Sequence, residues 1–490
     1  MNENPTSEFR PEARSPRGFA DKRKAQIAIE QRLITTVSKV YEDFGFEALQ
    51  TPAFEYADAL GKFLPDSDRP NVGVFAQQDD DEQWMALRYD LTAPLARFAA
   101  QNWDSLPKPF RRYAFGSVWR NEKPGPGRLR EFMQCDADTI GSDRPEADAE
   151  MIALAVAGFQ ACGVPCQIRI NNRKLLNGLL NGVGVTSPQQ QMGVLRAIDK
   201  LDRLGLEGVQ LLLGGGRKDE SGAFTKGAEL SDAAIGSVLG FVSAAQGTTS
   251  RSQVLERLSS VLSGSPEGQS GLEDLSRIGT ALAALGVSEE AAVLDPSIVR
   301  GLEYYTGAVF EAELLIETRD EKGELVRFGS VGGGGRYDDL VARFTGQTTP
   351  ATGFSFGVSR LAAALALAGE NMPAARGPVV IISFSDADMG EYLKLASEIR
   401  SAGMPAEVYL GRAGMKAQMK YADRRLSPAV VLLGGDELAA GSVTIKDLDL
   451  GRALALQISD NQAWREGRPG QVTLPRQEAI KHLKSIVESI

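Results

Sequence analysis

A short loop rich in glycine and proline, set between two long segments, constrains the fold of this chain more than any other feature. Residues 110–122 and 128–140 are each typical of a strand, and the segment 123–127 (Lys-Pro-Gly-Pro-Gly) cannot continue either of them. Because so short a connection returns the chain alongside itself, the two strands are expected to pair antiparallel. The sequence therefore predicts a β-hairpin here.

Charged and amide side chains gather on one face of this hairpin. Side chains alternate between faces along a strand, so Arg120 and Glu122 point the same way, and Arg130, Gln134 and Asp138 share one face of the return strand. Burying unpaired charges is costly, so this face is not a plain core face. A solvated face with ion pairs is the ordinary alternative for each residue alone. For the whole set beside a glycine-proline loop we favour a binding site.

The composition excludes several classes of function. The 490 residues suggest two to four domains, and no stretch approaches the roughly 20 apolar residues of a membrane helix. A net charge of −10 argues against a general polyanion binder, although it leaves room for local basic patches. His482 is the sole histidine and the three cysteines lack partner ligands, so histidine-based catalysis, a zinc site and a disulfide framework are not expected. We expect a reduced, cytoplasmic enzyme.

Changes in residue composition and spacing along the chain predict its domain organisation. Residues 22–44 have the spacing of an amphipathic helix, and a short strand follows at 46–51. Gly332 to Gly335 are expected to form a turn. The predicted class is α+β, with a sheet domain at 1–173 and 291–369, a mostly helical insertion at 174–290, a linker at 370–377 and an α/β domain at 378–490.

Two further segments carry groups suited to a small polar ligand. Arg300 stands at a glycine corner and is followed by the paired phenols Tyr304 and Tyr305. A fixed positive charge beside two phenols suits a ligand with an anionic end and a planar polar end. Asp90 and Thr92 offer a carboxylate and a hydroxyl to an ammonium group, although this spacing more often caps a helix.

Basic residues spaced by four recur near the C-terminus. On a helix they form one stripe, made of Arg412, Lys416, Lys420 and Arg424. Such a stripe is usually a solvated helix face. In a chain this acidic it is also a candidate footprint for a nucleic acid.

Several ordered segments resemble the histidyl-tRNA synthetases, a family of class II aminoacyl-tRNA synthetases. The matching segments are 87–94, 115–134, 294–310, 333–338 and 353–361, and residues from Lys416 to Gly441 resemble the family's anticodon-binding domain. The resemblance implies a homodimer with a class II antiparallel catalytic sheet, flanking helices, a helical insertion and a C-terminal α/β anticodon-binding domain.

The resemblance also implies a role for each matching residue. Catalysis is expected from Arg120 and Arg300. ATP is expected to bind at Arg120, Glu122, Arg128 and Arg360. Histidine is expected to bind through Asp90, Thr92 and Gln134 at its amino group, through Asp138 and Tyr305 at its imidazole, and also through Arg300 and Tyr304. The expected tRNA contacts are Lys123, Arg412, Lys416, Lys420 and Arg424, and no metal ligand is expected from the protein.

The implied reaction is the ATP-dependent attachment of L-histidine to tRNA(His) through a histidyl-adenylate, with Mg²⁺ accompanying ATP. One alternative stays open: relatives of the catalytic domain serve as non-ligating regulatory subunits of the ATP phosphoribosyltransferase of histidine biosynthesis. Such subunits usually lack the anticodon-binding domain, whereas this chain has an α/β segment in its place.

Two positions depart from the family pattern. Gly125 stands where the family often has a glutamine that helps to read the tRNA acceptor end, so we predict weak dependence on the extra 5′ nucleotide of histidine tRNAs. Ser359 stands where a glutamate often precedes the arginine that matches Arg360. This second change is expected to alter how Arg360 is held.

Overall fold

The computed structural model describes residues 11–63, 73–125, 129–218, 222, 224–299, 305–316, 318–319, 325–326, 329–368, 376–455 and 470–488. The chain divides into two compact units, Met1–Glu370 and Asn371–Ile490. Each unit is described by itself. None of the described helices is both long and apolar enough to cross a membrane.

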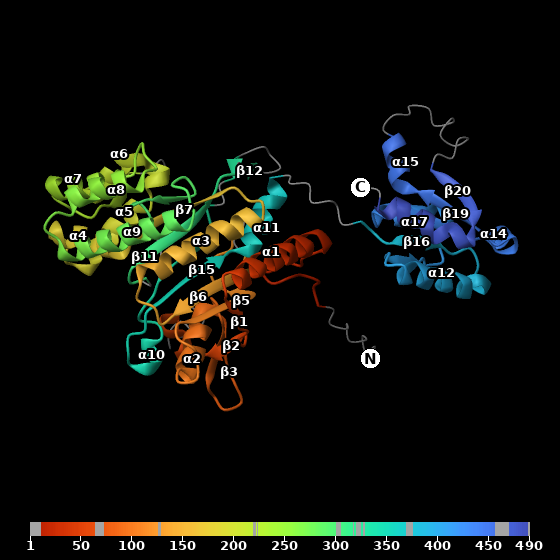
Figure 1. Cartoon of the computed structure of the whole chain (residues 1–490), viewed down its shortest axis with the longest axis horizontal. Coiled ribbons are helices and arrows are strands. Elements are labelled where there is room, and N and C mark those ends of the chain that lie inside the picture. Colours follow the sequence, from red (N-terminus) through yellow and green to blue (C-terminus); the bar gives the residue numbers. More distant parts are fainter. Residues whose placement is uncertain are drawn as a thin grey trace, which may run out of the picture. The chain divides into compact units, whose positions relative to one another are not determined.

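The larger unit is built on an eight-stranded sheet with the strand order β1-β5-β6-β15-β14-β11-β7-β10 (Figure 1). Neighbours from β5 to β7 all pair antiparallel, and the outermost strands β1 and β10 pair parallel. The predicted hairpin is therefore confirmed, and so is the α+β class. The strands are β1 (Glu47–Ala48), β5 (Phe110–Trp119), β6 (Glu131–Ile140), β15 (Ala351–Phe356), β14 (Ser330–Arg336), β11 (Ala308–Leu314), β7 (Cys166–Asn172) and β10 (Ala292–Leu294).

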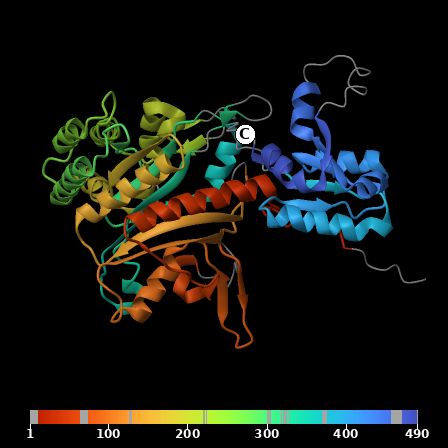
Figure 2. The same cartoon turned by 45° about the vertical axis from the view of Figure 1, so that its right-hand side comes forward.

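Helices cover one face of this sheet. They are α1 (Lys24–Asp43), α3 (Pro145–Ala161) and α11 (Val358–Leu367), and Figure 2 shows α1 lying along the strands. On this face the ring of Phe159 packs 4.4 Å from that of Phe356, and the Tyr41 hydroxyl donates to the carbonyl of Cys135. Because side chains alternate, the residues between these apolar ones point to the opposite face, which the three helices leave open.

Smaller elements lie beside the edge of the sheet that β1 and β5 form. A three-stranded sheet has the order β2-β4-β3 and contacts the adjoining helices through an apolar cluster that includes Leu60 and Tyr89. The elements are β2 (Phe54–Tyr56), η1 (Ala57–Phe63), β3 (Ala76–Gln78), β4 (Trp84–Leu87), α2 (Thr92–Asn102) and α10 (Ala342–Thr345).

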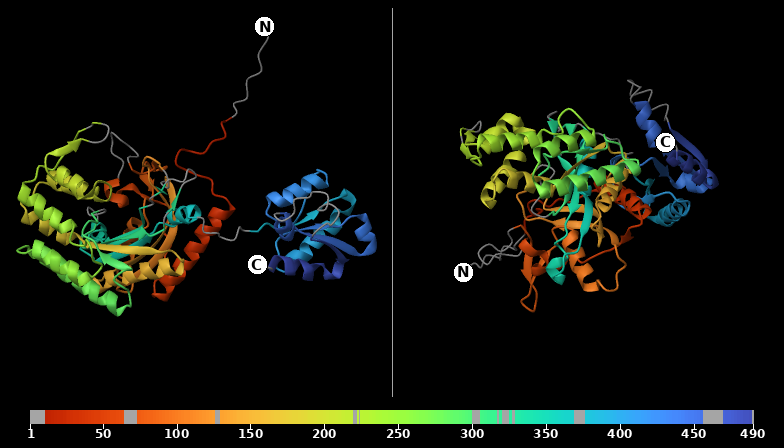
Figure 3. Two further views of the ribbon diagram at one scale, coloured as in Figure 1. Left: turned by 90° about the horizontal axis from the view of Figure 1, so that it is seen from above. Right: turned by 60° about the vertical axis from the view of Figure 1, so that its left-hand side comes forward.

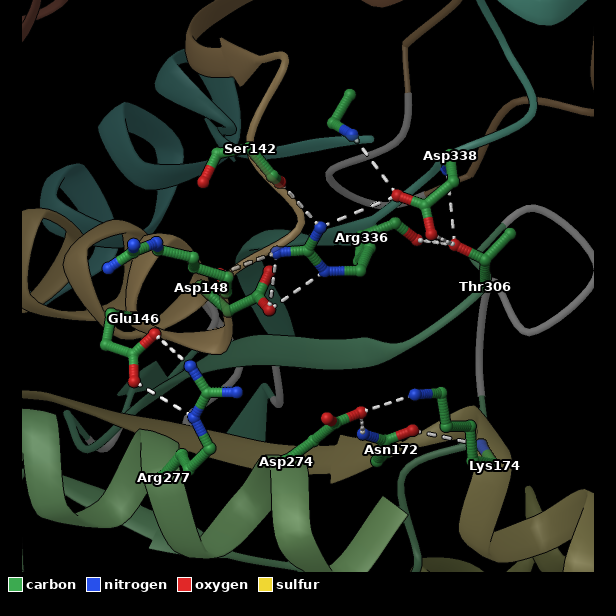
Figure 4. Close-up of polar contacts among 12 residues, drawn as sticks. Ser142, Glu146, Asp148, Asn172, Lys174, Asp274, Arg277, Thr306, Arg336 and Asp338 are labelled. Atoms are coloured by element: carbon green, nitrogen blue, oxygen red, sulfur yellow. Dashed lines mark hydrogen bonds and ion pairs between the residues drawn. The ribbon is translucent and has the colours of Figure 1, made fainter. Parts of the chain in front are cut away.

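The segment predicted as a helical insertion contains helices α4 to α9 and one short hairpin, β8–β9, that the sequence did not predict. One ion pair joins it to α3, which packs on the sheet (Figure 4): Arg277 to Glu146 at 2.7 Å. A second ion pair joins two helices of the insertion, Lys174 of α4 to Asp274 of α9 at 2.7 Å. The elements are α4 (Arg173–Gly182), α5 (Pro188–Ile198), α6 (Leu201–Leu213), β8 (Gly216–Lys218), β9 (Phe224–Lys226), α7 (Asp232–Val242), α8 (Arg251–Val261) and α9 (Pro266–Ala284). A further hairpin pairs β12 (Thr318–Arg319) with β13 (Leu325–Val326).

The smaller unit is a mixed α/β domain with the strand order β17-β16-β18-β19-β20 (Figure 3). Alternate residues of β16 enter different cores: Val379 and Ile381 pack with α12 and α17, whereas Val380 and Ile382 pack with α13 and α15. Helices therefore cover both faces, as a strand of continuous apolar residues requires. The elements are β16 (Val379–Ile382), η2 (Asp386–Asp388), α12 (Met389–Ser401), β17 (Ala406–Val408), α13 (Met415–Arg424), β18 (Ala429–Leu432), α14 (Gly435–Ala440), β19 (Ser442–Asp447), α15 (Leu448–Ala455), β20 (Gln471–Pro475), η3 (Arg476–Glu478) and α17 (Ala479–Glu488).

The turn predicted at Gly332 to Gly335 is wrong, because these glycines lie inside β14. They are needed for close packing rather than for turning. A Cβ on Gly334 would lie 2.0 Å from the carbonyl oxygen of Gly353, and one on Gly335 would lie 2.8 Å from the Tyr305 ring. Side chains here would therefore collide with the neighbouring strand and with Tyr305.

Candidate active site

The open face of the sheet carries a row of buried polar side chains on β6. Gln134, Asp136 and Asp138 follow one another at every second residue, so all three point to this face. In the strand register Asp138 lies opposite Arg112 of β5, and Asp136 lies opposite Ser355 of β15. Asp136 and Arg112 escaped the sequence prediction, although the same alternation that selected Gln134 and Asp138 includes Asp136.

Each carboxylate oxygen of Asp138 contacts a different neighbour. Its Oδ2 lies 2.8 Å from Nη2 of Arg112, and Tyr337 donates its hydroxyl hydrogen to Oδ1. Burial raises the pKa of Asp138, while Arg112 and Tyr337 oppose that rise. A Cβ on the facing Gly353 would lie 1.9 Å from Oδ1, so glycine is required beside this carboxylate.

Asp90 and Thr92 stand where α2 begins. The Asp90 carboxylate accepts the backbone N–H groups of Thr92 at 3.1 Å and Ala93 at 2.8 Å, which is the helix-capping geometry. Burial raises the pKa of Asp90 despite these hydrogen bonds. Arg112 donates to the carbonyl of Leu91 at 2.8 Å, so the helix start is tied to the open face. Asp90 therefore has both the capping role and a place near the polar row.

Tyr305 lies close to the same group of carboxylates. Its ring covers Gly335, and burial together with the charges of Asp138, Asp136 and Asp90 raises its pKa well above the usual range. The phenol is therefore neutral at physiological pH and retains a hydrogen to donate. Three candidates from the sequence, Arg128, Arg300 and Tyr304, fall outside the described residues.

Gln134 and Asp136 each have one buried oxygen without a hydrogen-bond partner among the described residues: Oε1 of Gln134 and Oδ1 of Asp136. The amide nitrogen of Gln134 donates to Oγ of Ser355 at 2.7 Å. Burial, reinforced by the charge of Asp138, raises the pKa of Asp136 to about 7. Buried polar atoms are normally satisfied, so these two oxygens mark a place where a ligand is expected.

Arg120 lies just beyond the end of β5. Its Nε donates to the carbonyl of Tyr89 at 3.1 Å, and its guanidinium lies 5.2 Å from the centre of the Phe132 ring. Glu122 and Lys123 follow in the loop, where both are exposed. The cation is therefore held in place at the edge of the open face.

The face predicted for Arg130 stays a prediction, because this residue directly precedes β6, which begins at Glu131. Its Nε donates to the carbonyl of Glu122 at 3.0 Å, and its backbone N–H donates to the carbonyl of Gly18 at 2.7 Å. Arg130 therefore braces the loop against the N-terminal segment.

Arg360 lies in the first turn of α11, and Ser359 explains how that turn is held. Oγ of Ser359 accepts the backbone N–H of Met133 at 2.9 Å and donates to Glu30 of α1 at 2.5 Å. Lys22 in turn pairs with Glu30 at 2.8 Å. A carboxylate thus stands beside Ser359 after all, although it comes from α1.

The four basic residues of the smaller unit that the sequence proposes for tRNA contact are all exposed. Lys416, Lys420 and Arg424 lie on α13, but Arg412 lies in the loop before it, so the predicted four-residue helical stripe is wrong at that position. No ion pair involves these four residues within the described ranges, whereas the neighbouring Arg425 pairs with Glu407 at 3.0 Å.

Known proteins resemble the chain over nearly its whole length. Residues 18–361 match the family model Histidyl-tRNA synthetase, and residues 378–485 match the model Anticodon binding domain. The histidine–tRNA ligase of Caulobacter vibrioides is 66% identical, with 99% of each chain covered. The crystal structure of histidyl-tRNA synthetase from Nostoc superposes with a TM-score of 0.71 at 28% identity, covering 97% of this chain and 99% of that one.

A third likeness concerns the fold alone. The structure of an ATP phosphoribosyltransferase regulatory subunit/histidyl-tRNA synthetase from Bacillus halodurans superposes with a TM-score of 0.65 at 22% identity, covering 84% of this chain and 97% of that one. The family match over the sheet unit and the identity to the curated relative are far stronger. The chain therefore belongs to the histidyl-tRNA synthetase family.

Proposed function

We propose that the chain joins histidine to its tRNA at the expense of ATP, and that the open face of the sheet is the amino-acid site. One observation carries the placement of that site. Three carboxylates lie together on this face: Asp136 and Asp138 are buried and Asp90 is half-buried, and each interacts electrostatically with Arg112. Arg120 also acts on Asp90, and Arg88 on Asp136. Neighbouring like charges disfavour one another, and a ligand that brings an ammonium group offsets this repulsion.

Histidine fits this face at both of its polar ends. Asp90, Thr92 and Gln134 are proposed to bind the amino group, and Asp138 with Tyr305 to bind the two imidazole nitrogens. A carboxylate accepts one N–H, and a neutral phenol donates to the other nitrogen. A substrate without these nitrogens would form neither of the two hydrogen bonds, which is a basis for rejection. Arg300 and Tyr304, outside the described residues, are proposed to bind the carboxylate end.

The proposed chemistry has two steps. The histidine carboxylate attacks the α-phosphorus of ATP and releases pyrophosphate, and the terminal ribose of the tRNA then attacks the acyl carbon. Negative charge builds on the α-phosphate in the first step, so cations that are already in place stabilise that transition state. We assign this role to Arg120 and Arg300. Arginine stays protonated, so this stabilisation does not titrate near neutrality.

The rest of the ATP is proposed to lie along the edge of the sheet. Glu122 and Arg128 come from the hairpin loop, and Arg360 stands at the start of α11, where the helix dipole favours an anion. The half-buried ring of Phe132, on the same face beside Arg120, offers a surface on which a purine can stack.

Mg²⁺ is proposed to accompany the phosphates of ATP. Mg²⁺ prefers oxygen ligands and is commonly held by one or two carboxylates together with substrate phosphates. Glu122, an exposed carboxylate close to Arg120, fits one such contact. Within the described residues no group of three or more His, Cys, Asp or Glu side chains is arranged to hold a metal ion. When bound, the ion would neutralise charge on the departing pyrophosphate.

Contacts to tRNA are proposed on both units. Lys123 lies in the exposed hairpin loop, and the exposed residues Lys416, Lys420, Arg424 and Arg412 belong to the unit that matches the anticodon-binding model. Phosphate binding depends on such cations.

We further propose that the protein works as a homodimer in the cytoplasm. The match to the anticodon-binding model also favours ligation over the regulatory-subunit alternative, because such regulatory subunits usually lack an anticodon-binding domain.

Histidine-dependent exchange of pyrophosphate into ATP tests the proposal. The wild-type chain should catalyse exchange with histidine and not with phenylalanine, and it should charge a histidine tRNA transcript. Arg300→Ala should abolish exchange while leaving the oligomeric state unchanged by size-exclusion chromatography. A wild-type protein that folds but shows no histidine-dependent exchange would contradict the proposal.

A further inference from the structure

Ser355 links Gln134 to Asp136 in a hydrogen-bond relay. The Gln134 amide nitrogen donates to Oγ of Ser355 at 2.7 Å, and the Ser355 hydroxyl, opposite Asp136, acts as a hydrogen-bond partner that lowers the pKa of the Asp136 carboxyl. Ser355 lies opposite Asp136 in the strand register, so the relay crosses from β6 to β15 and back. Asp136 therefore stands between the residue proposed for the amino group and Asp138, which is proposed for the imidazole.

The relay has a direction when Asp136 is ionised. A hydroxyl has one hydrogen, and a carboxylate can only accept, so Ser355 must donate to Asp136 and accept from Gln134. The amide of Gln134 is then fixed with its NH₂ toward Ser355 and its oxygen away from it. This places two buried acceptors, Oε1 of Gln134 and Oδ1 of Asp136, on the open face, each without a partner in the described part of the chain.

We propose that Asp136 is a further histidine-binding residue, which accepts an N–H of the substrate ammonium at Oδ1 and, through Ser355, keeps the Gln134 oxygen turned toward the same ammonium. The inference rests on the proposed amino-acid site. An ammonium carries three donors and no acceptor, so it matches a pocket that offers only oxygens. The expected substrate class is an α-amino acid with a free amine.

The direction of the relay depends on the protonation of Asp136. A protonated carboxyl can donate to Ser355, and Ser355 can then donate to the Gln134 oxygen, which turns the NH₂ group toward the substrate. The ammonium would then meet donors instead of acceptors. The charged and titratable groups around Asp136 lie on several elements. They are Arg112 from β5, Arg88 just after β4, Asp138 and Cys135 on its own strand, Asp90 at the start of α2, Tyr41 of α1 and Tyr305 beyond Gly335.

The sign of the pH effect follows from these neighbours. Burial and Asp138 raise the pKa of Asp136 to about 7, while Arg112 opposes the rise. The ammonium binds the ionised form, so histidine affinity should be full above this pKa and should fall as the pH drops below it. A bound ammonium stabilises the carboxylate, so the pKa in the complex should be lower than in the free protein.

Two substitutions separate the effect of the Asp136 charge from the effect of the hydrogen-bond relay. Asp136→Asn removes the charge but can still accept from Ser355 through its amide oxygen. Ser355→Ala keeps the charge but releases the Gln134 amide. In pyrophosphate exchange, Asp136→Asn should raise KM for histidine about 10- to 100-fold, the usual range for a hydrogen bond to a charged group, and should leave KM for ATP within about twofold. Ser355→Ala should raise KM for histidine about 3- to 10-fold.

The pH profile identifies the titrating group. The imidazole of free histidine titrates near 6.5 in every assay, so the informative quantity is the ratio of KM values, Asp136→Asn over wild type, from pH 6 to pH 8. This ratio should grow as the pH rises, because only the wild type gains a carboxylate. A ratio independent of pH, or a KM for histidine within twofold of wild type at pH 8, would overturn the inference. Absence of exchange in the wild type would instead overturn the proposed function.

Two analogues provide a test that needs no variant. Histidinol keeps the amine and the imidazole, whereas 3-(imidazol-4-yl)propionate lacks the amine. As inhibitors of wild-type exchange, histidinol should lose more affinity than the amine-free compound between pH 8 and pH 6. Equal losses would contradict a role for Asp136 at the amine, and they would do so even if Asp136→Asn failed to fold.

Discussion

The sheet of the larger unit carries two buried arginine–aspartate pairs that face opposite ways. Arg336 of β14 points toward α3, where it pairs with Asp148 at 2.9 Å and also donates to the carbonyls of Ser142 and Arg144 (Figure 4). Arg112 of β5 points to the open face and pairs with Asp138 at 2.8 Å. The two pairs are similar in chemistry and in depth of burial.

They differ in how fully the arginine is hydrogen-bonded. All three nitrogens of Arg336 have hydrogen-bond partners, whereas Nε and Nη1 of Arg112 have none among the described residues. Oδ1 of Asp148 is the one atom of the α3 pair that has no hydrogen-bond partner there. The acceptors Oε1 of Gln134 and Oδ1 of Asp136 beside Arg112 are also unpaired there. Stability alone favours the complete arrangement, since an unpaired buried group costs roughly 1–3 kcal/mol. The comparison teaches that the α3 pair holds the fold, while the open-face pair is prepared for a ligand.

Removing a cation at the edge of the open face should have the largest effect. Arg120→Ala should reduce histidine-dependent pyrophosphate exchange about 10³-fold, because charge on the α-phosphate loses a prepositioned partner. The control is Arg111→Ala, within β5 but facing the helices, where Arg111 pairs with Glu150 at 2.8 Å. Arg111→Ala should leave exchange within about threefold. Equal losses in the two variants would show that both arginines act only through the fold.

Breaking the α3 pair should affect stability rather than activity. Asp148→Asn removes the nearer of the two carboxylates that pair with the buried Arg336 and leaves only Asp338, at 3.5 Å, which should lower the free energy of unfolding by about 3 kcal/mol. Urea denaturation followed by fluorescence measures this loss. At a temperature where the variant is folded, its KM for histidine should match the wild type. A KM for histidine raised more than tenfold in the folded variant would place Asp148 in the histidine site. It would contradict the distinction between a pair that holds the fold and a pair that binds the ligand.

The smallest effect is expected outside both pairs, in the hairpin loop. Because Gly125 has no side chain to read the acceptor end of the tRNA, deleting the extra 5′ nucleotide of a histidine tRNA transcript should lower kcat/KM for aminoacylation less than about tenfold. Parallel assays of the two transcripts measure this ratio. Aminoacylation that collapses without the nucleotide would mean that other residues of the loop read it.

The period-2 pattern of the hairpin made much of the site predictable from the sequence. It placed Gln134 and Asp138 correctly on one face, and the basic residues of α13 followed from helical spacing with the exception of Arg412. Arg112 was not predictable in this way. It stands in an apolar strand, and its importance comes from Asp138 and Leu91, which are distant in the sequence.

The glycines of β14 show a second limit. A run of four glycines is most often a turn, and nothing local distinguishes Gly332 to Gly335 from one. Their place in a strand depends on the carbonyl of Gly353 and on the ring of Tyr305, which no local pattern contains. Ser359 is similar, because the carboxylate that supports it comes from Glu30, far earlier in the chain.

Binding of L-histidine in the absence of ATP and tRNA tests the central claim most directly. Saturating histidine should raise the melting temperature of the wild type and of Asp148→Asn, because a ligand that binds only the folded state stabilises it. Asp138→Asn should show a much smaller rise than either, since an amide offers the imidazole N–H no charge and one acceptor oxygen in place of two. A rise in Asp138→Asn equal to that of the wild type would contradict the assignment of the open face as the histidine site.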